Sequence, residues 1–592
     1  MKNFNLFRKN TKYLKYDYSD SLCREDTVNH LIHICSQNKA SINSYWKKMR
    51  AYYDGNHEIR THTSIFTNDK DIPWSPAQSP DGYIAVESQL DPSIPDFEFS
   101  PRGKDDYEKA KQREEITHYV CDINDLETKN SINERRLAIY GTAIWKVCWD
   151  SSSFDGTNHG EVLIDTPKPE QIFTDPSSTT VDGCEYIGYM YRIHKEKAKR
   201  IFRNDLETKN IDIESFVDPY RTDSSYFDLT GKDRCSYDNL DETITVTEWW
   251  FRQPCDGKQT ISMNIDGKKV SVDYSWSAGD IALSILVGGK EVRYIPNYWN
   301  NTDCKMFPFV IYCKVPNEDT IWGKSELESI IPLIDAADRE LSFAQLNSAF
   351  CSNDIIVAEE NALCDDSELD NSPGAVWKLR PGMMGKIQRL GNSSYSETYQ
   401  YNNTEQWRNL IQATTGNFDM YQGREPTRVT TASGIALLNE RAKSRQSIKK
   451  VIRSEGFKRL FELIDRTTLE YYNDGRVILI GAASKDATVF KFSNFASYPK
   501  GSKSAYIPVI DVKIHIGDGV SNSKAFTVQA LSDLIRTPIT QDNYKLVQSF
   551  VDLIGLPMRK EICDMLESKF SQQDLLLETL GKEQFYNDGQ QL

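Results

Sequence analysis

The side chains best suited to contact phosphate lie in residues 421–474, where a polar loop runs into a long amphipathic segment. From Arg424 to Arg459 the chain carries ten Lys and Arg residues against three Glu, a net charge of +7, whereas the whole chain has a formal net charge of −15. Positive charge concentrated at one place on an acidic protein favours contact with a polyanion there and repulsion elsewhere. A surface helix whose cations face only water would have the same composition, so both interpretations stay open.

The pattern of residue types separates this stretch into a loop and a helix. Gly423 and Pro426 disfavour helix in the first part, and apolar residues then recur mostly every three or four positions from Ile435 to Ile464. This periodicity predicts a helix over 433–472 that buries one face. Gly456 within it predicts a kink or a point of close packing.

Signals for enzymatic chemistry are weak. Residues 307–325 resemble a strand followed by the Gly-Lys-Ser end of a phosphate-binding loop, but the position of the first glycine holds Glu318. Glu318 and Asp319 would repel the phosphates that such a loop must cradle. The 8 His form no spaced ligand pattern, and His30 and His33 favour local packing over a metal site. We therefore expect no catalytic residues, no metal and no cofactor, and a protein that is not an enzyme.

Length and composition narrow the class of protein. With 592 residues and 39% hydrophobic content the chain can bury several cores, and about two to four domains are expected. No apolar run approaches the ~20 residues of a membrane span, and the N-terminus lacks the apolar core of a secretion signal. The 12 Cys form no C-x-x-C pair and are expected to be reduced thiols. These features predict a soluble, intracellular protein with no membrane partner.

The first half of the chain predicts a mixed α+β block. Helical patterns occupy 20–70, an irregular region rich in Pro and Asp follows over 71–101, and a charged amphipathic helix is expected over 105–140. A short helix is expected over 195–210. Alternating apolar residues predict strands at 143–149, 161–164, 186–193, 243–251 and 309–315.

Two further helices flank a small acidic insert. The first is expected over 325–350, with a kink at Pro332, and the second over 396–418, leading into the basic loop. The insert, residues 351–392, is rich in turns and carries seven acids and no base from Asp354 to Asp370. Its strand-like runs are residues 355–358 and 375–379.

Three runs of sequence follow one another in a distinctive order. The first is Ile-Tyr-Gly-Thr-Ala at 139–143, with residues 167–173 and an Asp-Pro pair after it. The second, within 308–336, is Pro-Phe-Val, then Gly-Lys-Ser-Glu-Leu-Glu, then Leu-Ile-Asp-Ala. The third is Ala-Ser-Gly-Ile-Ala-Leu at 432–437, the start of the long helix. In these motifs and in the order of its elements, over about 300 residues, the sequence resembles a tailed-bacteriophage portal (head–tail connector) protein.

The resemblance implies a multi-domain α+β portal fold. The implied segments are an N-terminal wing (1–321), a first stem helix (322–350), a small mixed clip (351–393), a second stem helix (394–420), a tunnel loop (421–432), a long kinked helix that returns to the wing (433–525), and a helical C-terminal crown (526–592).

The resemblance also implies a function. Portal proteins form a ring, typically of twelve subunits, at one capsid vertex, and double-stranded viral DNA is packaged and ejected through its channel. The implied partners are other copies of the chain, double-stranded DNA, the terminase large subunit, head-completion or adaptor (neck) proteins, and the major capsid and scaffolding proteins. The implied location is the portal vertex of the virion, and the host cytoplasm during assembly.

Candidate site residues follow from the same resemblance. The tunnel loop would present Gly423, Arg424, Thr427, Arg428, Thr430 and Thr431 to the DNA channel. Arg441, Lys443 and Arg445 would face DNA or a neighbouring subunit, and Arg424 and Arg428 have the alternative of pairing with carboxylates. The clip would bind partners through Asp365, Asp366, Glu368 and Asp370.

Two other classes of protein remain as alternatives. A terminase-type packaging ATPase is disfavoured by Glu318 in the loop-like motif and by the lack of a clustered acidic nuclease site. Another nucleic-acid-binding assembly factor, acting as a monomer, is disfavoured by the length of 592 residues. Ring formation or ATP hydrolysis would separate these classes.

Overall fold

The structure is a computed structural model in which the chain forms two compact units, residues 1–94 with 103–509 and residues 95–102 with 510–592. We describe each unit by itself. The structure describes residues 18, 20–57, 77–91, 93–103, 106–154, 159–209, 211–213, 219–220, 243–265, 268–302, 304–352, 355–359, 362, 378–383, 385–390, 397–415, 432–472, 477–480, 488–491 and 507–515.

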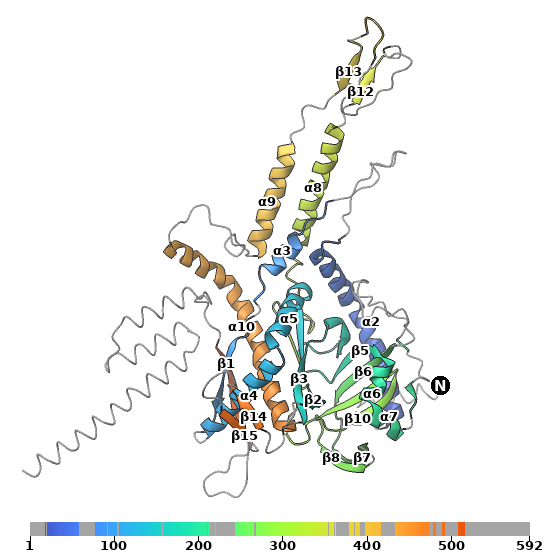
Figure 1. Ribbon diagram of the computed structural model, residues 1–592, viewed down its shortest axis with the longest axis vertical. Helices are drawn as coiled ribbons and strands as arrows, with labels where there is room; N and C mark the ends of the chain where they lie inside the picture. The colour runs from blue at the N-terminus through green and yellow to red at the C-terminus, as the bar shows by residue number, and fades with distance from the viewer. Residues whose placement is uncertain are drawn as a thin grey trace, which may run out of the picture. The chain divides into compact units, whose positions relative to one another are not determined.

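The described elements are a mixture of helices and strands, with more residues in helices than in strands (Figure 1). The helices are α2 (Ser21–Tyr53), α3 (Asp81–Glu87), α4 (Tyr107–Ile123), α5 (Leu126–Tyr140), the 3-10 turn η3 (Pro169–Gln171), α6 (Lys195–Ile201), α7 (Arg203–Lys209), α8 (Ile331–Ser352), α9 (Glu397–Thr415) and α10 (Ala432–Tyr471). The strands are β1 (Asp96–Pro101), β2 (Thr142–Phe154), β3 (His159–Asp165), β4 (Ile172–Thr174), β5 (Tyr186–His194), β6 (Thr243–Arg252), β7 (Gly257–Ile265), β8 (Lys268–Trp276), β9 (Ile281–Val287), β10 (Lys290–Ile295), β11 (Phe309–Cys313), β12 (Ile355–Ala358), β13 (Ile387–Leu390), β14 (Val477–Ile480), β15 (Thr488–Lys491) and β16 (Ile510–His515).

Two antiparallel sheets form the body of the first unit. One has five strands in the order β10-β9-β6-β5-β4, and the other has three in the order β11-β2-β3. A buried ion pair joins them, since Lys146 Nζ on β2 lies 2.6 Å from Glu248 Oε2 on β6. Tyr191 on β5 donates its hydroxyl to the same carboxylate at 3.2 Å. The sheets are therefore held together by a satisfied polar contact within an apolar core.

Helix α2 covers the five-stranded sheet. Its inward positions recur at three- and four-residue steps, and their side chains pack against aromatic residues of the sheet. The α2 side chains of this core are Val28, Leu31, Ile32 and Cys35, and those of the sheet include Phe173, Tyr186, Trp249 and Phe251. At the edge, Arg24 Nε lies 2.6 Å from Glu291 Oε2 on β10, so a buried ion pair fixes the helix along the strand direction.

The strands expected from alternation are present as β2, β3, β5, β6 and β11. Four strands in residues 257–295, β7 to β10, were not predicted. Strand β9 is buried at every position, and its residues are apolar except for Ser284, so its sequence does not alternate between apolar and polar residues. The expectation of an irregular region over 71–101 was wrong for its described part, which contains α3 and β1. The short helix expected over 195–210 is two helices, α6 and α7, separated at the buried Phe202.

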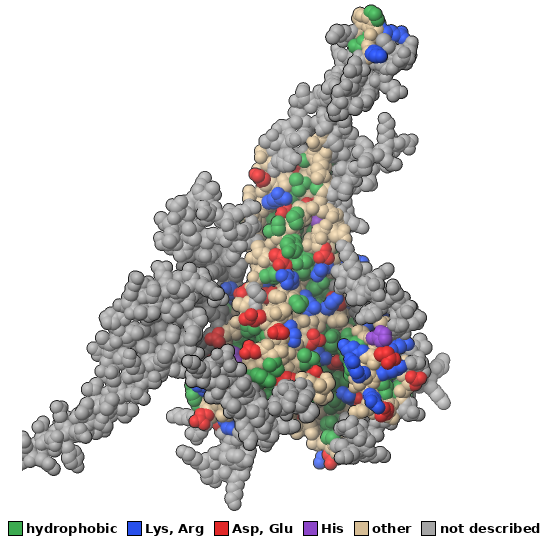
Figure 2. Space-filling view, in the orientation of Figure 1, with side chains coloured by type: hydrophobic (Ala, Val, Ile, Leu, Met, Phe, Trp, Pro, Cys, Tyr) green, Lys and Arg blue, Asp and Glu red, His purple; other side chains and the backbone are tan. Residues whose placement is uncertain are grey.

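Helices α8 and α9 pack side by side and lead to a two-stranded ribbon of β12 and β13 (Figure 1). Helix α8 begins at Ile331 and not at Ser325 as expected, so Pro332 lies in its first turn, where its missing N–H is tolerated. Strand β12 was predicted, but its partner β13 was not. Residues 375–377 of the other strand expected there lie outside the described residues. On the helical hairpin formed by α8 and α9, apolar side chains lie between polar ones (Figure 2). Phe343 on α8 is 40% exposed and Leu410 on α9 is 48% exposed.

The second unit is described at one antiparallel pair, β1 with β16. Phe97 and Phe99 of β1 and Ile510 and Val512 of β16 are buried there. The two strands are far apart in sequence, and their register pairs Asp96 with His515.

The single helix expected over 105–140 is instead two helices, because the chain turns at Asn124 and Asp125. Asp125 adopts a left-handed φ of 47°. The Asn124 side chain accepts a hydrogen bond from Ile164 N at 2.9 Å and donates one to Val162 O at 2.8 Å. The Asn124 side chain thereby satisfies backbone groups on the edge of β3 that a neighbouring strand would otherwise bond. This long-range contact outweighs the local preference for continuous helix, which periodicity alone detects.

Asn124→Ala should lower the free energy of unfolding by about 2–3 kcal/mol, because it leaves two buried backbone groups of β3 without partners. The exposed Asn38→Ala serves as the control and should stay within about 0.5 kcal/mol of wild type. Urea unfolding of the purified chain measures both. Equal stability of the two variants would contradict the assigned role of Asn124.

Candidate nucleic-acid interface

The basic stretch meets the described structure at helix α10. The candidate loop residues Gly423, Arg424, Thr427, Arg428, Thr430 and Thr431 lie outside the described residues, as do Asp365, Asp366, Glu368 and Asp370. Arg441, Lys443 and Arg445 stand on the described helical backbone of α10. The helix predicted over 433–472 is confirmed, with bounds one residue earlier at each end.

The C-terminal half of α10 is packed into the first unit. Five of its apolar side chains are fully buried: Phe457, Leu460, Phe461, Leu463 and Ile464. Gly456 is a point of close packing, as predicted, because a Cβ there would lie 2.7 Å from Cγ of Tyr312 on β11. Only a glycine lets the helix backbone approach the ring so closely, and this contact fixes α10 against the three-stranded sheet.

A second set of contacts fixes the same helix electrostatically. Arg453 Nε lies 2.6 Å from Glu134 Oε1 on α5, and Lys449 Nζ lies 2.9 Å from Glu326 Oε1 just before α8. Lys314 lies between the two carboxylates, 3.5 Å from Glu134 and 3.9 Å from Glu326. We call these five residues the junction network. Its two carboxylate side chains are 0% and 9% exposed, so the attraction is poorly screened by solvent.

The charges of the junction network stabilise one another. Burial alone would raise the pKa of Glu326, but the ammonium groups of Lys314 and Lys449 outweigh it and hold that pKa below its ordinary value. Burial likewise opposes the charge of Arg453, and the carboxylate of Glu134 reverses the effect and raises its pKa. Arg453 also donates to the backbone carbonyl of Asp91 at 2.8 Å. Each buried charge is thus paired, as burial requires.

Three of the ten cations in the basic stretch form ion pairs with described carboxylates of the same chain. Lys449 and Arg453 belong to the junction network, and Arg459 pairs with Asp182. The sequence shows ten cations in this stretch but not which of them have partners, because the partner carboxylates lie more than 100 residues away in the chain. No spacing rule in one sequence could have found these pairs.

The Gly-Lys-Ser run packs against the Ile-Tyr-Gly-Thr-Ala run. Gly141 has a left-handed φ of 77°, and a Cβ on it would lie 2.6 Å from the carbonyl oxygen of Gly323. The amides of the Gly-Lys-Ser run already have protein acceptors: Gly323 N donates to Thr142 Oγ1 at 2.9 Å, and Ser325 N donates to Tyr45 Oη at 2.8 Å. These amides hold residues 323–325 to β2 and α2, and they are not free to cradle a phosphate.

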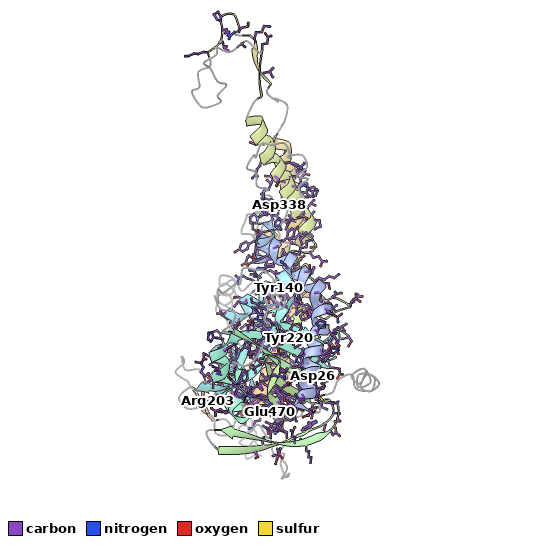
Figure 3. All side chains as sticks on the ribbon, turned by 90° about the vertical axis from the view of Figure 1, so that its right-hand side faces the viewer. Asp26, Tyr140, Arg203, Tyr220, Asp338 and Glu470 are labelled. Atoms are coloured by element: carbon purple, nitrogen blue, oxygen red, sulfur yellow. The ribbon has the colours of Figure 1, made fainter. Side chains whose placement is uncertain are left out.

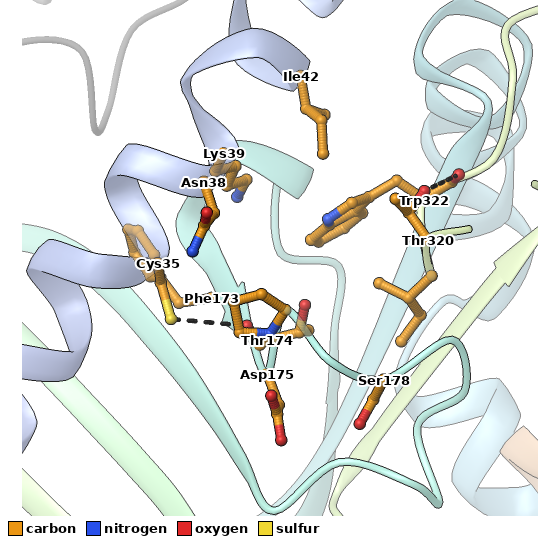
Figure 4. A pocket seen from close by; sticks show the side chains of 12 residues that line it. Cys35, Asn38, Lys39, Ile42, Phe173, Thr174, Asp175, Ser178, Thr320 and Trp322 are labelled. Carbon is orange, nitrogen blue, oxygen red and sulfur yellow. Dashed lines mark hydrogen bonds between the residues drawn. The ribbon is translucent and has the colours of Figure 1, made fainter.

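A buried lysine ties α2 to the Pro-rich run at 167–173 (Figure 4). Lys39 Nζ donates to the carbonyls of Pro169, Glu170 and Ile172 at 2.6, 3.1 and 2.5 Å. The rings of Trp46, Phe173 and Trp322 lie about it at 4.9 to 5.2 Å. Burial lowers the pKa of Lys39 to about 7, whereas three carbonyl acceptors and three ring faces favour the charged form. We assign it the charged form, because a neutral amine has only two N–H groups for three acceptors.

The base of α8 is anchored by its own carboxylates (Figure 3). Asp338, which is fully buried, lies 2.7 Å from His57 Nε2 and accepts a hydrogen bond from Ser79 N at 2.8 Å. One turn earlier, Asp335 accepts from the hydroxyl of Tyr52 at 2.6 Å. The helix therefore leaves the body of the unit from a fixed position, set by residues on both sides of α2's C-terminal end.

No group of His, Cys, Asp and Glu that could hold a metal ion occurs within the described ranges. Among the helices that the structure describes, none combines the length and the apolar character that crossing a bilayer requires.

The described part of the first unit thus combines a mixed α and β body, a helical hairpin and a long helix that belongs to the basic stretch. Comparison with protein families supplies the particular family. The sequence matches the model of the Phage P22-like portal protein family over residues 85–585. The chain therefore belongs to this family and is a phage portal protein. No curated protein matches the chain.

Membership of the portal family establishes several general properties of the chain. The family is structural rather than catalytic, and it belongs to the portal vertex of the capsid, in an assembly with other phage proteins. The mixed α and β content agrees with the α+β class expected from the sequence. The resemblance drawn from the three motif runs is confirmed, and two of these runs lie in contact in the structure.

Glu326→Gln should lower the free energy of unfolding at pH 7 by about 2 kcal/mol, because it removes a charge-assisted hydrogen bond to Lys449. The folded-state pKa of Glu326 lies below its ordinary value of 4.5, so this stabilisation is fully present above pH 4.5 and is lost as the pH falls through the folded-state pKa. Urea unfolding between pH 6 and pH 3 should therefore show the difference between wild type and variant shrinking.

The matched control is Glu185→Gln, which changes an exposed carboxylate. It should leave the free energy of unfolding within about 0.5 kcal/mol of wild type at each pH. A difference between wild type and Glu326→Gln that stayed constant down to pH 3 would mean that the junction network does not stabilise the fold through charge.

Proposed function

We propose that the chain assembles into a ring, expected to contain twelve subunits, at one capsid vertex, and that double-stranded viral DNA is packaged and ejected through the ring. The same ring serves as the docking platform for the terminase and then for neck or tail proteins. The observation that carries the proposal is the family match, which covers most of the chain. The charge distribution and the anchoring of α10 support it further.

The charge distribution suits a conduit better than a clamp. A tight DNA-binding protein neutralises many phosphates at once, whereas a channel must let duplex slide past. This chain is acidic overall, whereas residues 424–459 carry a net charge of +7. An acidic wall keeps DNA centred by repulsion, and a few cations lower the barrier to its passage. In a ring each lone Arg is repeated in every subunit, so Arg424 and Arg428 would form two rings of charge.

The anchoring of α10 supports this role for the preceding loop. The junction network and the Gly456–Tyr312 contact hold the helix on the sheet of the same subunit. A loop that runs into a helix held in this way is presented from a rigid support. We propose that Arg424 and Arg428 face the channel, with Thr427 and Thr430 donating hydroxyl groups to phosphate oxygens. Arg441, Lys443 and Arg445 face DNA or the acidic side of the next subunit.

The exposed apolar side chains of α8 and α9, the proposed stem hairpin, are evidence for ring formation. Phe343 on α8 and Leu410 on α9 are partly exposed on two helices that pack mainly against each other. In a closed ring of identical subunits, such residues are covered by the neighbouring copy. The acids at 365, 366, 368 and 370 lie between these two helices in sequence. We propose that they form the surface that the terminase and later the adaptor proteins bind.

Native mass spectrometry of the purified chain, with negative-stain microscopy, tests the assembly. The expected result is a closed ring of about twelve subunits with a central hole wide enough for B-form duplex. A stable monomer at every salt concentration, together with ATP hydrolysis, would overturn the proposal.

Arg424→Ala with Arg428→Ala tests the channel residues. The double variant should form rings like wild type but package DNA about two- to fivefold more slowly in a packaging assay, because each subunit loses two of the positive charges proposed to face the channel. The control, Lys47→Ala with Lys111→Ala, removes the same charge from exposed positions on α2 and α4 and should package at the wild-type rate. Packaging by the Arg variant at the wild-type rate and to the wild-type length would remove the support for channel-facing arginines.

A further inference from the structure

A second concentration of positive charge lies far along the chain from α10, on the short helix α6. Its seven residues include Lys195, Lys197, Lys199 and Arg200 against the single acid Glu196, and Arg203 begins the next helix. Figure 2 shows Lys and Arg side chains gathered over the part of the unit where Figure 1 places α6 and α7. We call these five cations the α6 patch. The residues proposed to face the DNA channel do not include these five.

The stability of the helix does not account for this charge. Lys199 and Arg200 lie in the last turn, where cations favour the helix dipole, but Lys195 and Lys197 lie in the first turn, where cations oppose it. Ion pairs neutralise only part of the patch, since Lys199 pairs with Glu196 at 2.9 Å and Arg203 with Glu207 at 3.0 Å. Within the described part of the chain, Lys195, Lys197 and Arg200 make no ion pair, and the last two are exposed.

Unlike three of the cations in the α6 patch, the cations described on α7 and β10 form ion pairs. On α7 and β10 the cations have carboxylate partners: Lys209 lies 3.5 Å from Glu291, and Arg293 lies 2.5 Å from Asp205. Lys290, at the start of β10, lies 3.2 Å from Glu25. These three cations are thus paired, whereas Lys195, Lys197 and Arg200 of α6 make no ion pair with other described residues. Such a local imbalance is typical of a surface that meets an anionic partner.

The patch is presented by a rigid support. Ala198 and Phe202 are buried beneath the helix, and the His194 ring accepts a hydrogen bond from Glu196 N at 3.2 Å, which caps its first turn. Beside Arg200 stands Ile201, a large apolar side chain that is 48% exposed. The surface therefore offers an apolar contact next to the cations.

We propose that the α6 patch binds an acidic segment of a partner protein, whose carboxylates meet Lys197 and Arg200 and whose apolar side chains cover Ile201. A nucleic acid fits less well. Seven helical residues span only about 10 Å, which limits the patch to a few phosphates, and non-specific DNA binding depends on many. Glu196 and Glu207, 70% and 59% exposed, stand among the cations and would repel a continuous phosphate track. The apolar contact with Ile201 suits a protein side chain.

The proposal is independent of the DNA channel, and its test involves no DNA translocation. The probe is a fluorescein-labelled 18-residue peptide of repeating Glu-Glu-Leu, added to the purified full-length chain and followed by fluorescence anisotropy at 50 and 300 mM salt. We expect binding that weakens at high salt. Lys197→Ala with Arg200→Ala should weaken it about tenfold, and Lys47→Ala with Lys111→Ala should leave it unchanged.

Two further measurements make the test specific. Charge reversal, Lys197→Glu with Arg200→Glu, should abolish binding of the acidic peptide and create binding of a Lys-Lys-Leu peptide of the same length. Ile201→Ser should weaken peptide binding without changing its salt dependence. Circular dichroism checks that each variant is folded, as expected for exposed positions.

Three outcomes would overturn the proposal: peptide binding that is unchanged in the double Ala variant, peptide binding that is lost equally in the control, or tighter binding of an 18-base-pair duplex through the same residues. The last outcome would assign the patch to nucleic acid. None of these results bears on whether the chain forms a ring with a DNA channel, so the two proposals fail separately.

Discussion

The buried carboxylate of Glu134 is the constraint on which the arrangement of the first unit depends. It lies on α5 and pairs with Arg453 of α10 and with Lys314 just after β11. Glu326, just before α8, extends the same set of charges through Lys314 and Lys449. Three parts of the chain that are distant in sequence, around residues 134, 314–326 and 449–453, thus meet at two carboxylates. Removal of the partner of a buried carboxylate leaves an uncompensated buried charge, so none of the three can shift alone without a loss of stability.

The glycines near this network have the complementary role. Charge sets which segments meet, and the missing side chains of Gly141, Gly323 and Gly456 set how closely their backbones approach. At Gly323 a Cβ would lie 2.4 Å from Cβ of Cys313, a separation that no side chain could relieve by rotating. Attraction without close approach would leave the ions partly solvated and weak. The two features together explain how an acidic chain keeps a basic helix on its sheet.

The sequence predicted those features that are encoded locally. The 40-residue helix α10 and the strands β5 and β6 follow from the period of their apolar residues. The break at Asn124, the start of α8 at Ile331 and the partners of Lys449 and Arg453 depend on contacts with distant segments, which one sequence does not reveal. The candidate loop arginines came from the family resemblance, and their positions lie outside the described residues. The α6 cations were visible in the sequence, but only the structure shows that Lys195, Lys197 and Arg200 make no ion pair with other described residues.

The pairing of β1 with β16 has a consequence for synthesis. More than 400 residues separate the two strands, so at about 5–20 residues per second the ribosome makes β16 roughly 20–80 s after β1. During that interval β1 has no partner strand, and Phe97 and Phe99 lack the cover that they have in the finished protein. An unpaired strand with alternating aromatic residues is a site for unwanted association between nascent chains. Every copy of the chain made on one polysome would meet this hazard, and chaperone binding to the first hundred residues would relieve it.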